Sequence, residues 1–344
     1  MTERPYLDVR DLRVHFPTDD GVVKAVDGLS FSCARGRRLG IVGESGSGKS
    51  VTSLAIMGLH RAGSARISGE IRLGADQLVG ADPEMVRTLR GNAMAMIFQD
   101  PLSAMHPFYT VGHQIMEAYR THHDVSKAKA RERAIDLLDR VGIPQAKSRV
   151  DDYPHHFSGG MRQRAMIAMA LSCNPALLIA DEPTTALDVT VQAQILDLIL
   201  DLQQEFDSAV VIITHDLGVV AEVADDILVM YAGRAVETGS AEDVFAAPQH
   251  PYTWGLLGSV PRFDRERTER LLPIPGSPPS LITVPSGCPF HPRCAWAAHT
   301  GGRASTERPE LRPAGTGVDG HTVACHLSAE QRREIFTTEI GPKL

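Results

Sequence analysis

The sequence predicts an α/β fold with a parallel-sheet core, and three observations support this prediction. Residues 39–42, 176–180 and 210–213 are continuous apolar runs, as expected for strands buried on both faces. Residues 189–202 repeat apolar positions at helical spacing between two of these runs. A glycine-rich loop at residues 43–50 follows the first run and opens a helix. Strands that alternate with helices in this way build a parallel sheet covered by helices.

The elements around this core follow from the same patterns. Residues 6–42 mostly alternate apolar and polar positions, which predicts an antiparallel β region, and residues 67–73 add another β segment. Residues from about 91 to 175 have mostly helical spacing and predict a helical insertion. A helix at residues 219–223 and a strand at residues 227–231 complete the core.

The composition changes at Gln249-His250-Pro251, and this change predicts two parts. Residues 1–250 contain the α/β core and form the first domain. Residues 251–344 form a smaller extension, which is rich in proline between Pro273 and Pro292. Because proline interrupts both long helices and central strands, we expect the extension to be irregular.

The overall composition excludes several classes of protein. The chain has 344 residues, of which 43% are hydrophobic and 22% charged, with a net charge of −7. Such a chain has enough apolar residues for a core but no basic face for nucleic acid. It has no apolar run long enough for a transmembrane helix and no signal peptide at Met1–Pro5, so we expect a cytosolic location.

The loop at residues 43–50, Gly-Glu-Ser-Gly-Ser-Gly-Lys-Ser, has the pattern and setting of a phosphate-binding P-loop. Its glycines let backbone N–H groups point inward around anionic oxygens, and the following helix adds its positive N-terminus. Lys49 can reach the β- and γ-phosphates, and the Ser50 hydroxyl can ligate Mg²⁺. The alternative is a flexible Gly/Ser loop, which the preceding strand and following helix disfavour.

Two acidic residues follow the apolar run 176–180. Asp181 and Glu182 are predicted to lie at the carboxyl end of a parallel strand, where open α/β sheets bind ligands. Asp181 is a candidate to hold Mg²⁺, and Glu182 is a candidate base for an attacking water. Without the P-loop, a pair that caps the next helix would be the better interpretation.

A second glycine-containing motif, Ser158-Gly159-Gly160, precedes an apolar helical run. A helix start of this kind makes an anion site, although alone it would be interpreted as an ordinary N-cap. Together with the P-loop, it indicates a nucleotide that is held from two sides.

Six motifs in a fixed order resemble those of an ATP-binding-cassette (ABC) ATPase over about residues 6–250. They are Walker A at residues 43–50, the Q-loop residue Gln99, the signature at residues 158–163, Walker B at residues 176–182, the D-loop at residues 186–188 and the switch histidine His215. The signature departs from the commonest form, Leu-Ser-Gly-Gly-Gln, because Phe157 and Met161 stand here. Ser158 and Gly160, which would touch the γ-phosphate, are retained.

The resemblance implies that the chain binds ATP with Mg²⁺, that Phe16 stacks on the adenine, and that Gln99 reaches both Mg²⁺ and a membrane partner. The residues it assigns to ATP are Phe16, Gly43, Glu44, Ser45, Gly46, Ser47, Gly48, Lys49, Ser50, Val51, Ser158, Gly159, Gly160 and Asp188. Those for catalysis are Glu182, His215 and Gln99, and those for Mg²⁺ are Ser50, Gln99 and Asp181.

The tail resembles the C-terminal extension of oligopeptide and dipeptide importer ATPases, which nickel-importer relatives share. The resemblance rests on residues 250–253, 274–279, 287–294 and 323–326. Members often carry a four-cysteine iron–sulfur site in this extension. Here the cysteine expected near Gly301 is missing.

Three cysteines of the tail therefore remain: Cys288, Cys294 and Cys325. They leave three interpretations open. An iron–sulfur cluster could be completed by His299, His326 or water. The spacing Cys288-x-x-His291-x-x-Cys294, with Cys325 as a fourth ligand, would also suit Zn²⁺. The third interpretation is a metal-free remnant in which the cysteines pack as small apolar residues.

The sequence thus predicts an ATP-hydrolysing subunit that powers an ABC importer of oligopeptides or dipeptides. By resemblance, a second and related cassette, two membrane permeases and an extracytoplasmic solute-binding protein are its partners, and it lies on the cytoplasmic face of the membrane. Import of nickel or another solute is one alternative. A soluble ABC ATPase acting on nucleic acid or ribosomes is the other, and the single cassette and acidic net charge argue against it.

Overall fold

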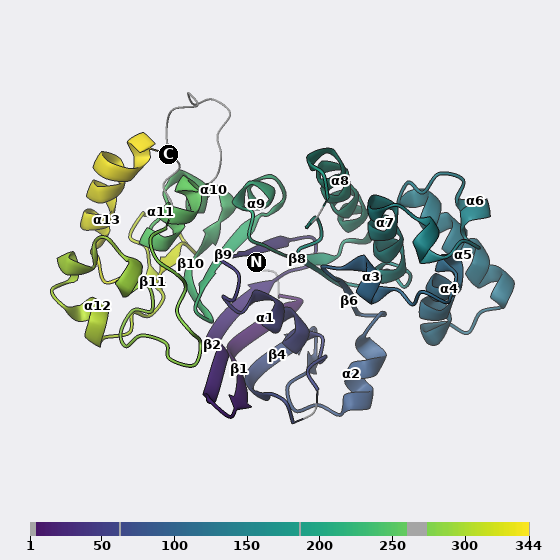
Figure 1. The fold of residues 1–344 in the computed structure, drawn as a ribbon, viewed down its shortest axis with the longest axis horizontal. Helices are drawn as coiled ribbons and strands as arrows, with labels where there is room; N and C mark the ends of the chain where they lie inside the picture. Colours follow the sequence, from purple (N-terminus) through teal and green to yellow (C-terminus); the bar gives the residue numbers. More distant parts are fainter. Residues whose placement is uncertain (1–4, 62, 186, 260–273, 344) are drawn as a thin grey trace.

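A computed structural model of the chain describes residues 5–61, 63–185, 187–259 and 274–343. Two sheets form its centre, with helices at both ends of the larger one (Figure 1). Within the described residues, no helix combines the length and the apolar character needed to cross a bilayer.

The larger sheet confirms the predicted α/β class with a parallel core. Its strands follow the order β11-β12-β10-β9-β3-β8-β7-β6, and the five from β9 to β6 are parallel. Every residue of β6, β7 and β8 is buried, as their apolar runs predict. The strands are β3 (Arg38–Val42), β6 (Met94–Ile97), β7 (Leu177–Asp181), β8 (Ala209–Thr214), β9 (Asp226–Tyr231), β10 (Arg234–Ser240), β11 (Arg312–Pro313) and β12 (Thr322–Val323).

The smaller sheet is antiparallel in the order β2-β1-β4-β5. Its strands are β1 (Leu7–Thr18), β2 (Gly21–Cys33), β4 (Arg66–Leu73) and β5 (Asp76–Gln77). The prediction of antiparallel structure up to residue 42 is wrong for its last strand, because β3 pairs in parallel with β8 and β9. The physical reason lies in β3 itself, because residues 39–42 are apolar and buried and therefore suit a strand covered on both faces.

The helices cover the parallel strands and also form a separate layer at the β6 end of the sheet. Helices α3 to α7 make up that layer, at the right of Figure 1. It begins after residue 97, because β6 belongs to the larger sheet. The helices are α1 (Lys49–Ile56), α2 (Pro83–Leu89), α3 (Pro101–Ala104), α4 (Val111–His122), α5 (Lys127–Arg140), α6 (Ala146–Arg149), α7 (Gly159–Ala170), α8 (Val189–Phe206), α9 (Leu217–Val223) and α10 (Ala241–Ala246).

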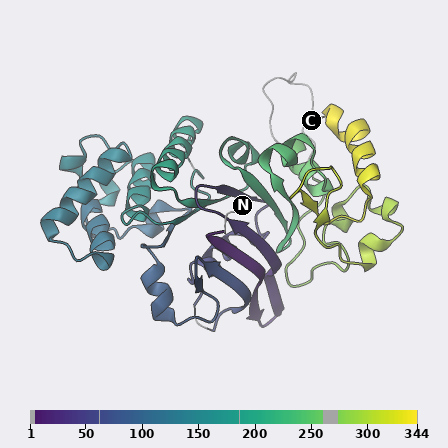
Figure 2. The same cartoon turned by 180° about the vertical axis from the view of Figure 1, so that it is seen from behind.

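The C-terminal extension lies at the opposite end of the larger sheet, as the view from behind also shows (Figure 2). It contains α11 (Pro251–Gly258), α12 (Arg303–Thr306) and α13 (Ala329–Ile335), together with β11 and β12. The extension is more regular than the sequence predicts, because β12 pairs with β10 and so lengthens the larger sheet. Two-residue strands such as these leave no recognisable period in a sequence.

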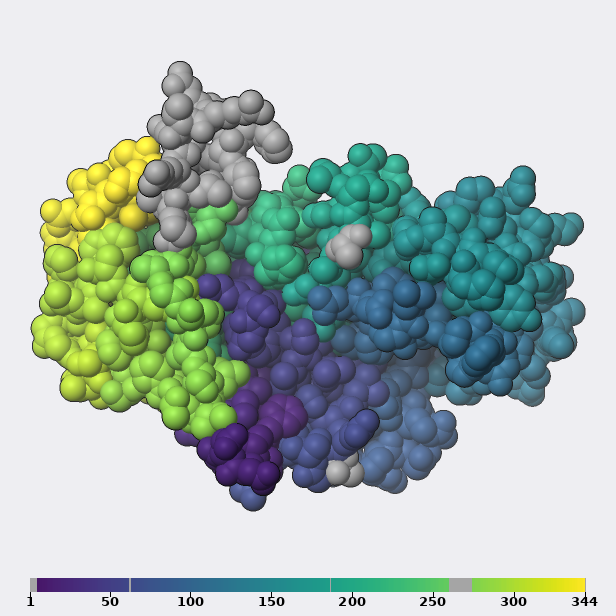
Figure 3. Space-filling view, in the orientation of Figure 1, coloured from purple at the N-terminus to yellow at the C-terminus, as the bar shows by residue number. Residues whose placement is uncertain are grey.

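A buried polar network fastens the extension to the sheet. The carboxylate of Glu237 in β10 accepts hydrogen bonds from the backbone N–H groups of Gln249 and His250, at 2.6 and 2.8 Å. His321 Nε2 lies 2.8 Å from the same carboxylate, and both side chains are fully buried. The extension also touches the smaller sheet, because the Lys24 N–H donates to the Leu281 carbonyl at 3.0 Å (Figure 3).

Candidate nucleotide site

A cavity of about 970 Å³ opens where the P-loop, the smaller sheet and the carboxyl end of β7 meet. It has the size of a small-molecule site. The residues around it come from elements far apart in the sequence. They are Phe16, Val23, Ala25, Gly43, Glu44, Ser45, Gly46, Gly48, Lys49, Ser50, Val51, Gln99, Glu182, His215, Leu256, Pro278 and Leu281.

The P-loop runs from β3 to α1 as predicted, and two of its glycines are required by space. A Cβ on Gly43 would lie 2.3 Å from the Met230 carbonyl oxygen. A Cβ on Gly48 would lie 2.2 Å from the Ala25 carbonyl oxygen, and Gly48 has a φ of 104°. Since no side chain fits at either position, only glycine allows the loop to pack against β2 and β9 in this conformation.

Lys49 is buried beneath the loop. Its Nζ donates to the carbonyl oxygens of Gly43 and Glu44 at 2.6 and 3.1 Å. Burial lowers the pKa of Lys49, while the carboxylates of Glu182 and Asp181 oppose this effect. The ammonium group thus stands within the loop, where an anionic phosphate would relieve the cost of its burial.

Asp181, the last residue of β7, is buried and accepts two hydroxyl hydrogen bonds. Ser50 Oγ donates to Oδ1 at 3.0 Å, and Ser53 Oγ donates to Oδ2 at 3.3 Å. Burial raises the pKa of Asp181, and the two hydroxyl groups partly offset this rise. Hydroxyl and carboxylate oxygens are the donors that Mg²⁺ prefers, so Ser50 and Asp181 fit this ion. Ser53 was missed by the sequence analysis, although its position one turn after Ser50 places it on the same helix face.

Glu182 follows Asp181 with a left-handed φ of 48°. This conformation is uncommon for a residue other than glycine and often marks a functional position. Its carboxylate accepts hydrogen bonds from Gln99 Nε2 at 3.0 Å and Thr185 Oγ1 at 2.9 Å. His215 Nδ1 lies 3.3 Å from its other oxygen. The three residues proposed for catalysis therefore meet at one carboxylate.

Three extension residues that the sequence analysis did not predict also border the cavity: Leu256, Pro278 and Leu281. They lie more than 200 positions from Phe16 and Val23, which border the same cavity. Apolar groups on two sides suit a flat heterocyclic base. No spacing rule connects segments so distant in sequence.

Four residues predicted to bind ATP lie outside the P-loop and do not border this cavity. Ser158, Gly159, Gly160 and Asp188 are not among the residues that border it. Ser158 caps α7 by accepting from Met161 N–H at 3.3 Å, and Asp188 caps α8 in the same way. Within one chain, Ser158 therefore acts as the ordinary N-cap that the alternative interpretation of its motif describes.

The three tail cysteines converge but do not form a metal site. Cys288, Cys294 and Cys325 border one cavity of about 20 Å³, which has room for about one water. Burial raises the pKa of Cys288 to about 11 and that of Cys294 to about 12, which favours the thiol over the metal-binding thiolate.

Two of the histidines proposed to complete the site, His291 and His326, border this cavity, whereas His299 does not. His291 Nδ1 lies 3.0 Å from the Cys288 carbonyl oxygen, and His326 Nε2 lies 2.7 Å from the Glu307 carbonyl oxygen. Across the described ranges, no group of three or more His, Cys, Asp or Glu side chains is arranged to hold a metal. The iron–sulfur cluster and the zinc site are therefore not supported among the described residues.

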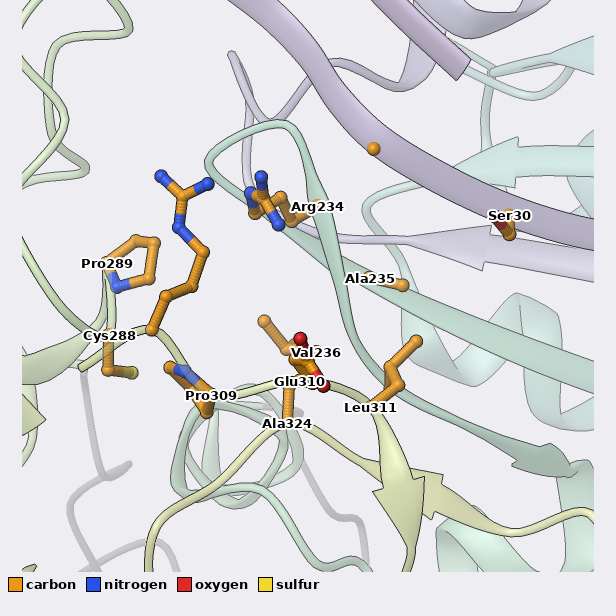
Figure 4. A pocket seen from close by; sticks show the side chains of 12 residues that line it. Ser30, Arg234, Ala235, Val236, Cys288, Pro289, Pro309, Glu310, Leu311 and Ala324 are labelled. Atoms are coloured by element: carbon orange, nitrogen blue, oxygen red, sulfur yellow. The ribbon is translucent and has the colours of Figure 1, made fainter. Parts of the chain in front are cut away.

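A second cavity, of about 300 Å³, lies between the extension and strands β2 and β10 (Figure 4). Arg234 and Arg308 stand at its edge, and both pair with Asp27, at 2.7 and 3.3 Å. Arg308 thus links the extension to β2, and Arg234 links β10 to the same carboxylate. Cys288 borders this cavity as well as the smaller one.

The P-loop with Lys49 suits a triphosphate, and Ser50 with Asp181 suits Mg²⁺, so the fold and this site define the class of P-loop nucleotide hydrolases. Two family comparisons are more specific. Residues 26–185 match the ABC transporter family, and residues 236–300 match the oligopeptide/dipeptide transporter C-terminal region.

The curated relatives agree with both matches. The oligopeptide transport ATP-binding protein OppD of Salmonella typhimurium is 55% identical over 291 residues, covering 85% of this chain and 86% of that protein. The dipeptide transport ATP-binding protein DppD of Escherichia coli is 50% identical over 320 residues, covering 93% and 96%. The chain therefore belongs to the family of ABC ATPases that serve oligopeptide and dipeptide transporters.

Solved structures have the same fold. The protein cbiO1 of Clostridium perfringens, part of the ABC transporter complex cbiONQ, has a TM-score of 0.58 and 27% identity, covering 71% of this chain and 92% of its own. The ATP-binding cassette MJ0796 has a TM-score of 0.62 and 24% identity, covering 68% and 98%. The fold class and the ATPase activity predicted from the sequence are thus confirmed.

Proposed function

We propose that this chain is the ATP-hydrolysing subunit of a membrane importer for oligopeptides or dipeptides. One observation carries the proposal: a P-loop ATPase site and a C-terminal region of the oligopeptide/dipeptide type occur in a single chain. The names of the relatives OppD and DppD support the choice of solute. Nickel or another solute remains an outcome of the test below.

In this proposal, Lys49 binds the β- and γ-phosphates, while Ser50 and Asp181 hold Mg²⁺ together with Gln99. Bound Mg²⁺ would neutralise charge that develops on the phosphates during transfer. Glu182 takes the proton of the attacking water, since its carboxylate borders the cavity and is oriented by Gln99 and Thr185. His215 Nδ1 faces the other oxygen of Glu182. In this proposal, His215 contacts the γ-phosphate.

The separation of Ser158, Gly160 and Asp188 from the cavity supports a site shared between two chains. A second cassette, in our proposal a related chain, supplies these residues to the phosphates bound at Lys49. The helix start at Ser158 would then add its positive end to the anion. An isolated monomer should hydrolyse ATP slowly, because its site lacks the residues that the second cassette would supply.

Two membrane permeases and an extracytoplasmic solute-binding protein complete the proposed importer, with this chain bound peripherally at the cytoplasmic face. Gln99 is the proposed link to the permeases. It lies two positions after the end of β6, in the connection to α3. We assign no nucleic-acid partner.

Uptake by whole cells tests this function. A strain lacking this gene is complemented with wild type or with Glu182→Gln, and uptake of labelled dipeptides, a labelled pentapeptide and ⁶³Ni²⁺ is measured. Peptide uptake that requires wild-type protein supports the proposal. Uptake of Ni²⁺ alone would overturn the peptide assignment. Recovery of ribosomes or DNA instead of permeases from solubilised membranes would overturn the transport role.

A further inference from the structure

A buried arginine of the extension holds the P-loop from outside. Arg293 Nη1 and Nη2 donate to the two carboxylate oxygens of Glu44 at 2.6 and 3.0 Å. Arg293 is 8% exposed, and its nitrogens also donate to Tyr231 Oη and to the carbonyl oxygens of Pro275 and Gly276. The guanidinium is planar, and each of its three nitrogens donates a hydrogen bond. It therefore holds the Glu44 carboxylate in one orientation.

The extension also holds the backbone of Glu44. The Glu44 N–H donates to Tyr252 Oη at 2.7 Å. Tyr252 lies in α11, is fully buried, and packs against the rings of Tyr231 and Phe290 with centroids 4.7 and 5.4 Å away. Both the main chain and the side chain of Glu44 are therefore held by the extension, through Tyr252 and Arg293.

The position of Glu44 has two consequences for a bound nucleotide. Its carbonyl oxygen accepts from Lys49 Nζ at 3.1 Å, so the place of Glu44 helps to set the place of the lysine. Glu44 also borders the nucleotide cavity, where its carboxylate would repel a triphosphate if it were unpaired. Arg293, which does not itself border the cavity, neutralises that charge.

We propose that Arg293 is a positioning residue of the nucleotide site. It holds Glu44 so that the P-loop keeps its binding conformation, and it neutralises the carboxylate beside the phosphates. The extension is then a working part of the ATP site. The proposal concerns nucleotide binding alone and is independent of which solute is transported.

The first test compares two buried arginines of the extension in the full chain. Arg332 donates to Gln249 Oε1 and to the carbonyl oxygens of Leu327 and Ala314, and to no P-loop residue. Both Arg293→Met and Arg332→Met should lower the melting temperature. Titration with ATP should show affinity reduced about tenfold or more in Arg293→Met only, since a charge-assisted pair is lost. Arg332→Met should stay within about twofold of wild type.

The second test asks whether Arg293 acts through Glu44. Adding Glu44→Gln to Arg293→Met removes the unpaired charge. The double variant should therefore bind ATP at least about threefold more tightly than Arg293→Met alone. Arg293→Lys, which keeps the charge but not the bidentate geometry, should give an intermediate affinity. This milder variant carries the test if Arg293→Met does not fold.

Wild-type ATP affinity in folded Arg293→Met or Arg293→Lys would overturn the proposal. Equal weakening by Arg332→Met, or no recovery on adding Glu44→Gln, would also overturn it, because a purely structural role predicts both.

Discussion

The side-chain amide of Gln99 donates to Glu182 Oε2 at 3.0 Å, and this bond joins the start of the helical layer to the nucleotide site. Gln99 lies two positions after the end of β6, and α3 begins two positions later at Pro101. Glu182 follows β7, the neighbouring strand. Movement of helices α3 to α7 relative to β7 would therefore lengthen or break this bond.

We predict that Gln99→Ala uncouples hydrolysis from the transporter. The loss of the amide should lower transporter-stimulated ATP hydrolysis about tenfold or more, the scale of one misplaced catalytic group, and basal hydrolysis several times less. Hydrolysis with and without permeases in lipid vesicles measures both rates. Gln194→Ala is the matched control, because Gln194 bonds Arg164 on the surface of α8. Equal loss of both rates in Gln99→Ala would contradict a coupling role.

Glu182→Gln should keep ATP binding and lower turnover by about 10²-fold or more. The carboxamide can still accept from Thr185 Oγ1, so the local geometry is preserved, but it cannot take a proton from water as a carboxylate does. Single-turnover hydrolysis in the assembled transporter is the measurement. A rate within about tenfold of wild type would exclude Glu182 as the base.

The buried carboxylate of Asp181 lowers the stability of the folded chain when no Mg²⁺ is bound. Burial raises its pKa, so the folded protein without Mg²⁺ holds a carboxylate that would be better solvated when unfolded. We expect Asp181→Asn to raise the melting temperature of the nucleotide-free chain by roughly 1–3 °C near pH 7, while Mg²⁺-dependent hydrolysis is lost.

The pH dependence of this stabilisation follows from the sign of the shift. A raised acid pKa means that wild type is favoured while Asp181 is protonated, and that this advantage disappears as pH rises through the folded-state pKa. The gain from Asp181→Asn should therefore shrink as pH falls toward 4. Calorimetry between pH 4 and pH 8 measures it. A gain that does not depend on pH, or a loss of stability near pH 7, would contradict the argument.

The parts of the nucleotide site whose residues lie close together along the chain could be predicted from the sequence. Gly43–Lys49 and Asp181–Glu182 could be placed because a strand, a loop and a helix follow one another within about ten residues. Arg293 forms an ion pair with Glu44, which lies 249 positions before it in the sequence, and only the folded chain brings the two together. Distant pairs of this kind leave no period or spacing in the sequence, which is why the contribution of the extension was missed.

Leu281 should contribute to nucleotide affinity from the extension. It borders the cavity together with Phe16, and its carbonyl is fixed to β2 by the Lys24 N–H. We predict that Leu281→Ala raises the KM for ATP about threefold to tenfold and leaves kcat unchanged, as expected for loss of apolar contact with a bound base. Ile282→Ala is the control, since Ile282 is exposed and does not border the cavity. Equal effects of the two variants would show that only the local fold is affected.

The last prediction concerns Cys288, Cys294 and Cys325, which border a cavity with room for about one water. Because burial raises the pKa of each thiol, we expect protonated side chains that pack as small apolar groups. Protein purified under strict anaerobiosis should contain iron, sulfide and zinc only at background, as elemental analysis would show. Near-stoichiometric metal in wild type, absent from the triple Cys→Ala variant, would contradict this.

The same variant separates packing from metal binding by stability. Replacing three partly buried cysteines with alanine should cost about 1–3 kcal/mol of unfolding free energy, and serine should cost more, because its hydroxyl groups would lack partners. The stabilisation from the protonated thiols is present below pH 9 and is lost as pH rises through the folded-state values of about 11 for Cys288 and 12 for Cys294. Wild type should therefore lose stability above pH 9 faster than the alanine variant. Since no hydrogen bond of the P-loop involves these thiols, ATP affinity should stay within about twofold.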